Sequence, residues 1–136
     1  MSDSVLLRKA QTIERCLRRI EEVYASDHAN LYSDMTKQDS ILLNLERACQ
    51  AAIDAGNRII RLRGLGLPRE SKDVFAILKS NEVISEELAQ TLVAMVGFRN
   101  VAVHDYQVLK LEIVRSIIEE KLSDLHELAQ IAVRFS

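Results

Sequence analysis

Apolar residues recur at helical spacing along almost the whole chain. Between residues 4 and 25 they lie three, four or seven positions apart, with arginines on the opposite face. This spacing places the apolar side chains along one side of a helix. The apolar set is Leu6, Ile13, Leu17, Ile20 and Tyr24, and the arginines are Arg8, Arg15, Arg18 and Arg19. The turn-favouring residues 26–30 predict a break after this first helix.

A longer apolar stripe predicts a second helix from about Gln38 to Arg63, with Thr36 or Asp39 as its N-cap. Three small residues within it are spaced four apart, which favours the close approach of another helix. They are Ala48, Ala52 and Gly56. Glycine after a basic last turn and proline beyond it, at Gly64 and Pro68, end the helix.

Three further helices follow. A short one is predicted over Lys72–Lys79 with Ser71 as its cap, and Ser85 caps the next helix. That next helix is apolar almost all round, which indicates burial on most sides and a possible subunit interface. The last helix spans about Lys110–Arg134. The prediction is one all-α domain over residues 1–136, an up-and-down bundle of four main helices plus one short helix.

Composition excludes several classes of protein. With 136 residues there is room for one core, and a net charge of −2 argues against nucleic-acid binding by bulk charge alone. Two cysteines exclude a disulfide framework and a four-cysteine zinc site, and their apolar helical positions predict packing roles. No apolar run approaches the ~20 residues of a membrane span. We therefore expect a soluble, cytoplasmic protein without a membrane partner.

One stretch, residues 97–106, does not fit a core or a plain solvated face. It brings Arg99, Asn100, His104, Asp105 and Tyr106 within eight residues, directly after the most apolar helix. Five positions of helix rotate Arg99 and His104 about 140° apart. The two side chains can therefore act together only if the helix ends between them or a second subunit supplies half of the site.

The residue types suit chemistry on phosphodiesters. Arginine offers a charged fork of donors that matches phosphate oxygens, and histidine exchanges a proton near neutral pH. Attack by an RNA 2′-hydroxyl needs both kinds of help and no metal, and no metal-ligand spacing is present. The alternative is that His104 is a capping or surface residue. His28 and His126 lack supporting neighbours and are predicted to be surface residues.

At these residues the chain resembles a known family. Arg99-Asn-Val-Ala-Val-His104-Asp-Tyr106 fits the R-x4-6-H signature of HEPN domains, and more closely the R-x4-H-x-Y form of HepT-like toxins. Asp39, Asn44-Leu45 and the pattern over Ala52–Ile60 look like the second helix of that family. The resemblance covers most of the chain, including helix order and length.

The resemblance implies a metal-independent endoribonuclease, the toxin of a type II-like toxin–antitoxin pair, with tRNA among its candidate substrates. It implies a homodimer in which two motifs face a shared cleft. Arg99 would bind the scissile phosphate, His104 would be the acid/base, and Asn100 and Asp39 would be accessory residues. The chain would need no cofactor of its own.

The resemblance also implies a partner, an antitoxin that is a nucleotidyltransferase of the MNT type. In R-x4-H-x-Y members this partner can transfer AMP from ATP to the tyrosine, here Tyr106. The added negative charge and bulk beside His104 would repel RNA phosphate. The alternative is that the Tyr106 ring packs on a neighbouring helix with its hydroxyl in water.

A basic segment offers a candidate RNA surface. Five cations against Glu70 give a local charge of +4 between positions 58 and 72. They are Arg58, Arg61, Arg63, Arg69 and Lys72. The arginine face of the first helix is a second candidate, and both patches also suit solvated faces or an acidic partner.

Two other functions remain open from the sequence. One is a non-catalytic HEPN-type helical module that binds a nucleotide or a partner protein. The other is a purely structural dimerisation bundle, in which the polar stretch has no chemical role.

Overall fold

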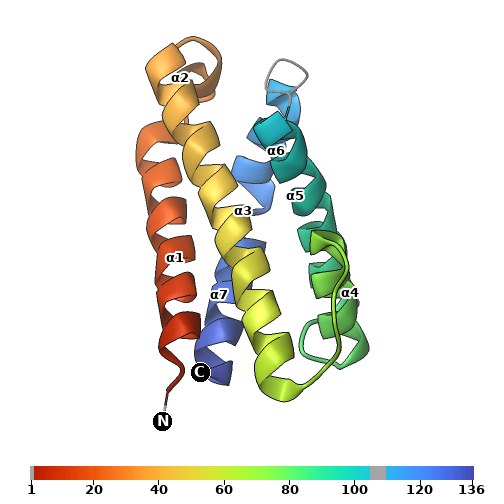
Figure 1. Ribbon diagram of the computed structural model, residues 1–136. Helices are drawn as coiled ribbons and strands as arrows, with labels where there is room; N and C mark the ends of the chain where they lie inside the picture. Colours follow the sequence, from red (N-terminus) through yellow and green to blue (C-terminus); the bar gives the residue numbers. More distant parts are fainter. Residues whose placement is uncertain (1, 105–109) are drawn as a thin grey trace.

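The structure is a computed structural model that describes residues 2–104 and 110–136, with the backbone alone described for 101–104. Within these ranges the chain forms seven helices and no strand. Figure 1 shows α1, α3, α5 and the pair α6 and α7 running along a common long axis, with α4 packed beside the lower half of α5. The predicted all-α bundle is therefore confirmed.

The first half of the chain forms α1 (Ser4–Tyr24), the short α2 (Ala29–Tyr32) and the long α3 (Met35–Arg63). Asp3 caps α1 by accepting a hydrogen bond from the Leu6 amide over 2.9 Å. The predicted caps of α3 are wrong, because Asp34 accepts from the Lys37 amide over 3.0 Å and starts the helix before Thr36. Gly64 ends α3 as expected, with a φ of 61° that favours glycine.

The next two helices are α4 (Ser71–Ser80) and α5 (Glu86–His104). The cap of α4 is Glu70 rather than the predicted Ser71. The reason is that Asp73 reaches back and accepts from the Glu70 amide over 3.0 Å, which starts the helix one residue earlier. Ser85 caps α5 as predicted, since its hydroxyl accepts from the Leu88 amide over 3.1 Å.

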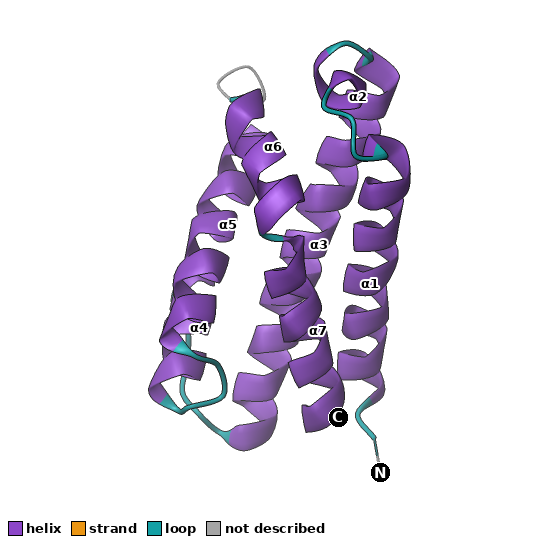
Figure 2. Cartoon of the chain, turned by 180° about the vertical axis from the view of Figure 1, so that it is seen from behind, coloured by secondary structure: helices purple, strands orange, loops and turns teal. Residues whose placement is uncertain are grey.

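The predicted last helix is two helices, α6 (Leu111–Glu120) and α7 (Leu122–Phe135). Figure 2 shows them stacked end to end between α5 and α1. They join at Lys121, whose φ of −121° and ψ of −4° leave the helical range. Because Ile118, Leu122 and Leu125 are all buried, the apolar stripe continues across the break and gave no sign of it.

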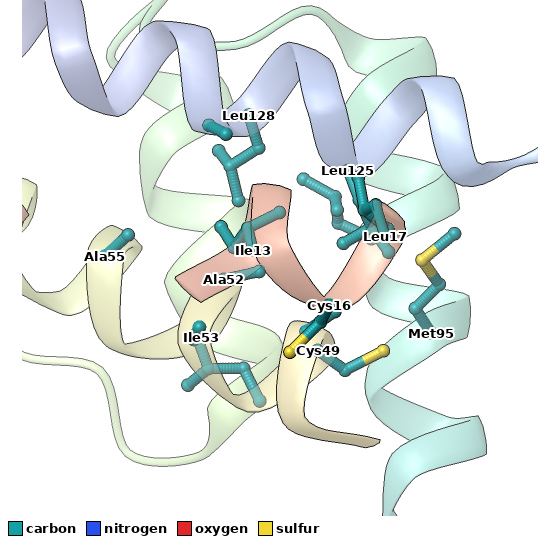
Figure 3. Close-up of a cluster of buried hydrophobic side chains, with 14 of the residues drawn as sticks. Ile13, Cys16, Leu17, Cys49, Ala52, Ile53, Ala55, Met95, Leu125 and Leu128 are labelled. Atoms are coloured by element: carbon teal, nitrogen blue, oxygen red, sulfur yellow. The ribbon is translucent and has the colours of Figure 1, made fainter. Parts of the chain in front are cut away.

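The core lies along the centre of the bundle and draws on every long helix. Figure 3 shows side chains of α1, α3, α5 and α7 meeting there, among them Leu17, Cys49, Met95 and Leu125. Both cysteines, Cys16 and Cys49, are free and buried, so their predicted packing roles hold. No helix of the described residues is long and apolar enough to cross a bilayer.

Gly56 explains how α4 comes close to α3. A Cβ at this position would lie only 2.4 Å from Cγ1 of Val74 and 3.3 Å from Cδ1 of Leu78. The absent side chain therefore makes room for α4, which is the close approach predicted from the small residues of this helix. This contact holds α4 in place beside α5.

Candidate functional site

Arg99 lies in the last part of α5 with a half-buried side chain. Its Nη1 atom donates to Oδ1 of Asn100 over 3.3 Å. Its Nε atom is buried and has no acceptor among the described residues. Buried donors in proteins are normally satisfied, so the guanidinium is suited to an acceptor from outside this set. The paired oxygens of a phosphate match its planar fork of donors.

The surroundings of Arg99 include Cys49 on α3. Burial raises the pKa of the Cys49 thiol to about 12, and the charge of Arg99 acts in the opposite direction. Within the described part of the chain no carboxylate forms an ion pair with Arg99. The site therefore presents a positive charge that a bound anion would neutralise.

The second predicted catalytic residue, His104, is the last residue of α5, which runs unbroken from Glu86. The helix does not end between Arg99 and His104, so their positions are about 140° apart around it. One of the two arrangements considered from the sequence, a break between the two residues, is therefore absent. The side chain of His104 and all of Tyr106 lie outside the described residues.

The two accessory residues are on different helices. Asn100 is exposed and accepts a hydrogen bond from Nη1 of Arg99. Asp39 is exposed near the start of α3. In Figure 1 the start of α3 and the end of α5 lie at the same end of the bundle, with α2 and α6. The fold thus places Asp39 and the Arg99–His104 segment at one end of the molecule.

The basic segment does not form a single open surface. Arg58 donates through Nη2 to Oδ2 of Asp3 over 2.8 Å. The guanidinium of Arg63 stacks over the ring of Phe135 with its carbon 4.8 Å from the ring centre. Lys72 forms a longer, exposed pair with Glu70, 3.4 Å between charged atoms.

Two members of the basic segment keep their side chains uncommitted. Arg61 and Arg69 are exposed, and neither side chain makes an ion pair with a described residue. The arginines predicted on one face of α1 are exposed as well, although Arg19 pairs with Glu22 over 3.3 Å. The predicted RNA contacts therefore differ in how readily they can bind a substrate.

The remaining histidines are exposed, as predicted. His28 meets the ring of Tyr32 edge to face, with ring centres 6.0 Å apart. His126 pairs with Glu14 across α7 and α1, with 2.6 Å between Nδ1 and Oε1. Among the described residues no three His, Cys, Asp or Glu side chains gather as metal ligands.

Sequence reasoning missed an ion-pair network that anchors α6. The Tyr24 hydroxyl of α1 donates to Glu119 of α6, which also accepts from Nε of Arg115 over 3.1 Å. Burial, with Glu119 beside it, raises the pKa of Tyr24 to about 12. In the sequence Tyr24 occupies an apolar position of the helical stripe, so the hydrogen bond from its hydroxyl to Glu119 could not be predicted. The network ties α6 to the last turn of α1.

Comparison with known proteins agrees with this geometry. Residues 13–131 match the family described as "Ribonuclease HepT-like". The chain is 43% identical to the mRNA nuclease HepT of Shewanella oneidensis over 125 residues, which are 92% of this chain and 93% of that protein.

Solved structures give the same relationship. The tri-AMPylated HEPN toxin of Shewanella oneidensis in complex with MNT antitoxin has a TM-score of 0.89 and 42% identity, covering 95% of this chain and 96% of that one. A crystal structure of a toxin–antitoxin with AMP-PNP has a TM-score of 0.90 and 41% identity, covering 95% and 97%. The chain therefore belongs to the HepT-like ribonuclease family.

Proposed function

We propose that this chain is the toxin of a toxin–antitoxin pair and cleaves RNA with Arg99 and His104. The observation that carries the proposal is the guanidinium of Arg99. Its Nε is buried without a described acceptor, and among the described residues its Nη1 donates to Asn100 alone, on the helix that ends at His104. The membership of the HepT-like family and the related mRNA nuclease support the same activity.

The proposed reaction needs charge stabilisation and a proton acceptor. The 2′-hydroxyl oxygen bonds to the adjacent phosphorus, and the bond from that phosphorus to the 5′ oxygen of the next nucleotide breaks. His104 takes the 2′ proton, and the leaving 5′ oxygen takes a proton from the imidazolium or water. Arg99 binds the phosphate oxygens as negative charge builds on them. The products are a 2′,3′-cyclic phosphate and a 5′-hydroxyl, and no metal takes part.

We further propose that the site is completed by a second copy of the chain. Arg99 and His104 lie about 140° apart on one unbroken helix, so pairing Arg99 with His104 of another copy removes the mismatch. Apolar surface is available for such contact. Ile113 of α6 is 50% exposed and lines one hollow together with the exposed Ala94 of α5. Exposed apolar residues on neighbouring helices suit a protein–protein interface.

The partner proposed for this toxin is a nucleotidyltransferase antitoxin of the MNT type. It would attach AMP to Tyr106, with the tyrosine oxygen bonding to the α-phosphorus of ATP and pyrophosphate leaving. The AMPylated toxin structure, bound to its MNT antitoxin, supports this for the present chain. Each added phosphodiester places a negative charge two positions from His104, where RNA phosphate must bind.

For the RNA surface we propose Arg61, Arg69 and Lys72 as contacts, supported by their exposure. Arg58 and Arg63 are weaker candidates, because their guanidinium groups already bind Asp3 and Phe135. Phosphate contacts of this kind position a strand and carry no sequence information.

The test is RNA cleavage by the purified protein in the presence of EDTA. We expect the parent to cut RNA and leave 2′,3′-cyclic phosphate ends, and His104→Ala to keep its fold while losing cleavage. Cleavage that requires added divalent metal, or leaves a 3′-hydroxyl, would contradict the mechanism. Equal cleavage by His104→Ala would remove His104 from it.

A second candidate is a non-catalytic module that uses Arg99 to hold a nucleotide or a phosphorylated partner. The buried Nε of Arg99, which has no acceptor among the described residues, suits any phosphate-bearing ligand to the same degree. Tight nucleotide binding by the parent without any RNA turnover would favour this function over the ribonuclease.

A further inference from the structure

The two glycines within the described helices have opposite environments. Gly56 is buried against Val74, and a side chain there would clash. Gly97 is exposed on α5, and an added Cβ would meet no described atom within 4 Å. Glycine inside a helix lowers stability relative to alanine. The packing of the described chain therefore gives no reason for glycine at position 97, and the open space beside it can take a group from outside the described residues.

Gly97 lines a cavity of about 360 Å³ between the start of α4 and the last turns of α5. This volume lies in the usual range for small-molecule sites. The walls on α5 are Val93, Val96, Gly97 and Asn100, and those on α4 begin at Glu70. The same Asn100 accepts the hydrogen bond from Arg99. The cavity thus adjoins the guanidinium that is proposed to bind the scissile phosphate.

The chemistry of the cavity fits a flat heterocycle better than a bare phosphate. Val93, Val96 and Gly97 form the apolar part of a mostly polar lining, and Gly97 adds no side-chain bulk to it. The polar rim mixes donors and acceptors, with the Lys72 ammonium and Ser71 hydroxyl opposite the Asn100 amide. A carboxylate, Glu70, is also present, which would repel a phosphate but can accept from a base amino group.

Lys72 is the member of the basic segment that reaches this cavity. Its ion pair with Glu70 is long, 3.4 Å, and both side chains are more than 60% exposed. Exposed pairs of this kind contribute little, so both groups remain able to turn toward a ligand. The end of α3 that carries Arg61 lines a different cavity, beside α1.

We infer that this cavity binds the nucleobase of the nucleotide next to the scissile phosphate and so sets the base preference of cleavage. The inference rests on the proposed ribonuclease function. Gly97 lets the ring approach the α5 backbone, while Lys72 and Asn100 face its edge. Glu70 and Lys72 together distinguish bases by the donors and acceptors along that edge, as hydrogen-bonding sites do.

The principal test is Gly97→Leu, which fills the floor of the cavity with a better helix former. We expect KM for RNA to rise at least about tenfold, which is the scale of a steric change in a pocket. The base preference at the cut should change, and the melting temperature should not fall. The control is Ala76→Leu, an exposed alanine of α4 that does not line this cavity. It should cleave as the parent does.

A second variant keeps the test decisive if Gly97→Leu folds poorly. Lys72→Met should shift the base preference and raise KM more than it lowers kcat. Its matched control is Lys79→Met, on the same helix but outside the cavity. Protein produced without the partner nucleotidyltransferase carries no transferred AMP and should show the same effects. This result would distinguish binding of an RNA base from binding of AMP carried on Tyr106.

Three results would overturn the inference. The first is that cleavage sites and KM for RNA are unchanged in both variants. The second is that Gly97→Leu no longer forms a dimer, which would assign Gly97 to a subunit contact. The third is that the effects of the variants appear only after AMP transfer to Tyr106. A failure of this inference can be distinguished from a failure of the ribonuclease proposal. The parent and His104→Ala are assayed in the same series and test that proposal independently.

Discussion

Arg99 carries a permanent positive charge. Among the described residues, only Asn100 accepts a hydrogen bond from it. A structural arginine in a half-buried position usually binds a carboxylate, because an unpaired charge loses hydration without compensation. Arg58 shows the structural arrangement in the same chain, with donors to both oxygens of Asp3. The contrast between these two arginines supports a binding role for Arg99 and a structural role for Arg58.

Arg99→Lys should lower kcat for RNA about a hundredfold, in the range for removing one stabilising donor from a transition state. Lysine keeps the charge but loses the planar fork that matches two phosphate oxygens. Initial rates on a defined RNA measure the effect, with Arg134→Lys as the control because Arg134 is exposed on α7 and lies outside both the motif and the proposed RNA surface. Parent-like rates in Arg99→Lys would show that bidentate phosphate binding is not its role.

Tyr106 is expected to accept AMP from ATP when the partner nucleotidyltransferase is present. Intact mass should increase by one or more AMP units in the parent and stay unchanged in Tyr106→Phe. RNA cleavage should fall as the mass rises, because each phosphodiester adds repulsion. An unchanged mass with a partner of demonstrated activity, or the same increase in Tyr106→Phe, would contradict the assignment.

At the scale of the helices, the sequence specifies where apolar faces lie much better than where helices begin. The apolar stripes of α1 and α3 follow from side-chain spacing alone, which is why the positions of these helices could be predicted. The cap of α3 could not be predicted, because Asp34, Thr36 and Asp39 are all good caps and only the path of the preceding loop decides among them. The break at Lys121 carries no glycine or proline, so the continuous stripe concealed it.

The two helical glycines should respond to alanine with opposite signs. Gly56→Ala should destabilise the fold by about 1–3 kcal/mol, since its Cβ would overlap Val74 and force α4 away. Gly97→Ala should stabilise it by up to about 1 kcal/mol, since no described atom opposes the added methyl. Midpoints of denaturant unfolding measure both changes. Shifts of the same sign would show that one of these environments is assigned wrongly.

At the scale of the whole molecule, the two chain ends are tied together beside the termini of α1 and α7. The Asp3 amide donates to the Ser136 carbonyl over 2.9 Å, and its carboxylate binds Arg58 of α3. The hydrogen bond from Arg58, with help from the Leu6 amide, lowers the pKa of Asp3 below its ordinary value of 3.8. Tyr24 and Arg115 lower the pKa of Glu119 from 4.5 in the same way.

These lowered pKa values predict acid sensitivity. A group whose folded pKa is depressed stabilises the fold above its unfolded pKa and loses that contribution as pH falls through the folded value. The melting temperature should therefore fall as pH drops below the ordinary values of 4.5 and 3.8. Asp3→Asn keeps a good helix cap and should flatten this dependence. Exposed Glu127→Gln is the control, and an Asp3→Asn profile parallel to the parent would contradict the assignment.

The relative arrangement of the proposed catalytic residues could not be predicted from the sequence. The sequence motif identifies Arg99 and His104 as candidates, and regular helical geometry places them on different faces of one helix. The structure adds that α5 is unbroken between them. The cavity beside Gly97 was likewise beyond sequence reasoning, because it depends on where α4 packs against α5. A chain of 136 residues is enough for one core, and in our account it contributes half of each active site.

The measurement that tests this account most directly uses two inactive variants in one dimer. Arg99→Ala and His104→Ala are each purified alone and co-expressed with different tags, and RNA cleavage is measured per protomer. A site built from Arg99 of one copy and His104 of the other leaves one intact site in each mixed dimer. Random pairing should then restore about a quarter of the parent rate. A mixture that contains mixed dimers but cleaves no faster than either variant alone would contradict the account.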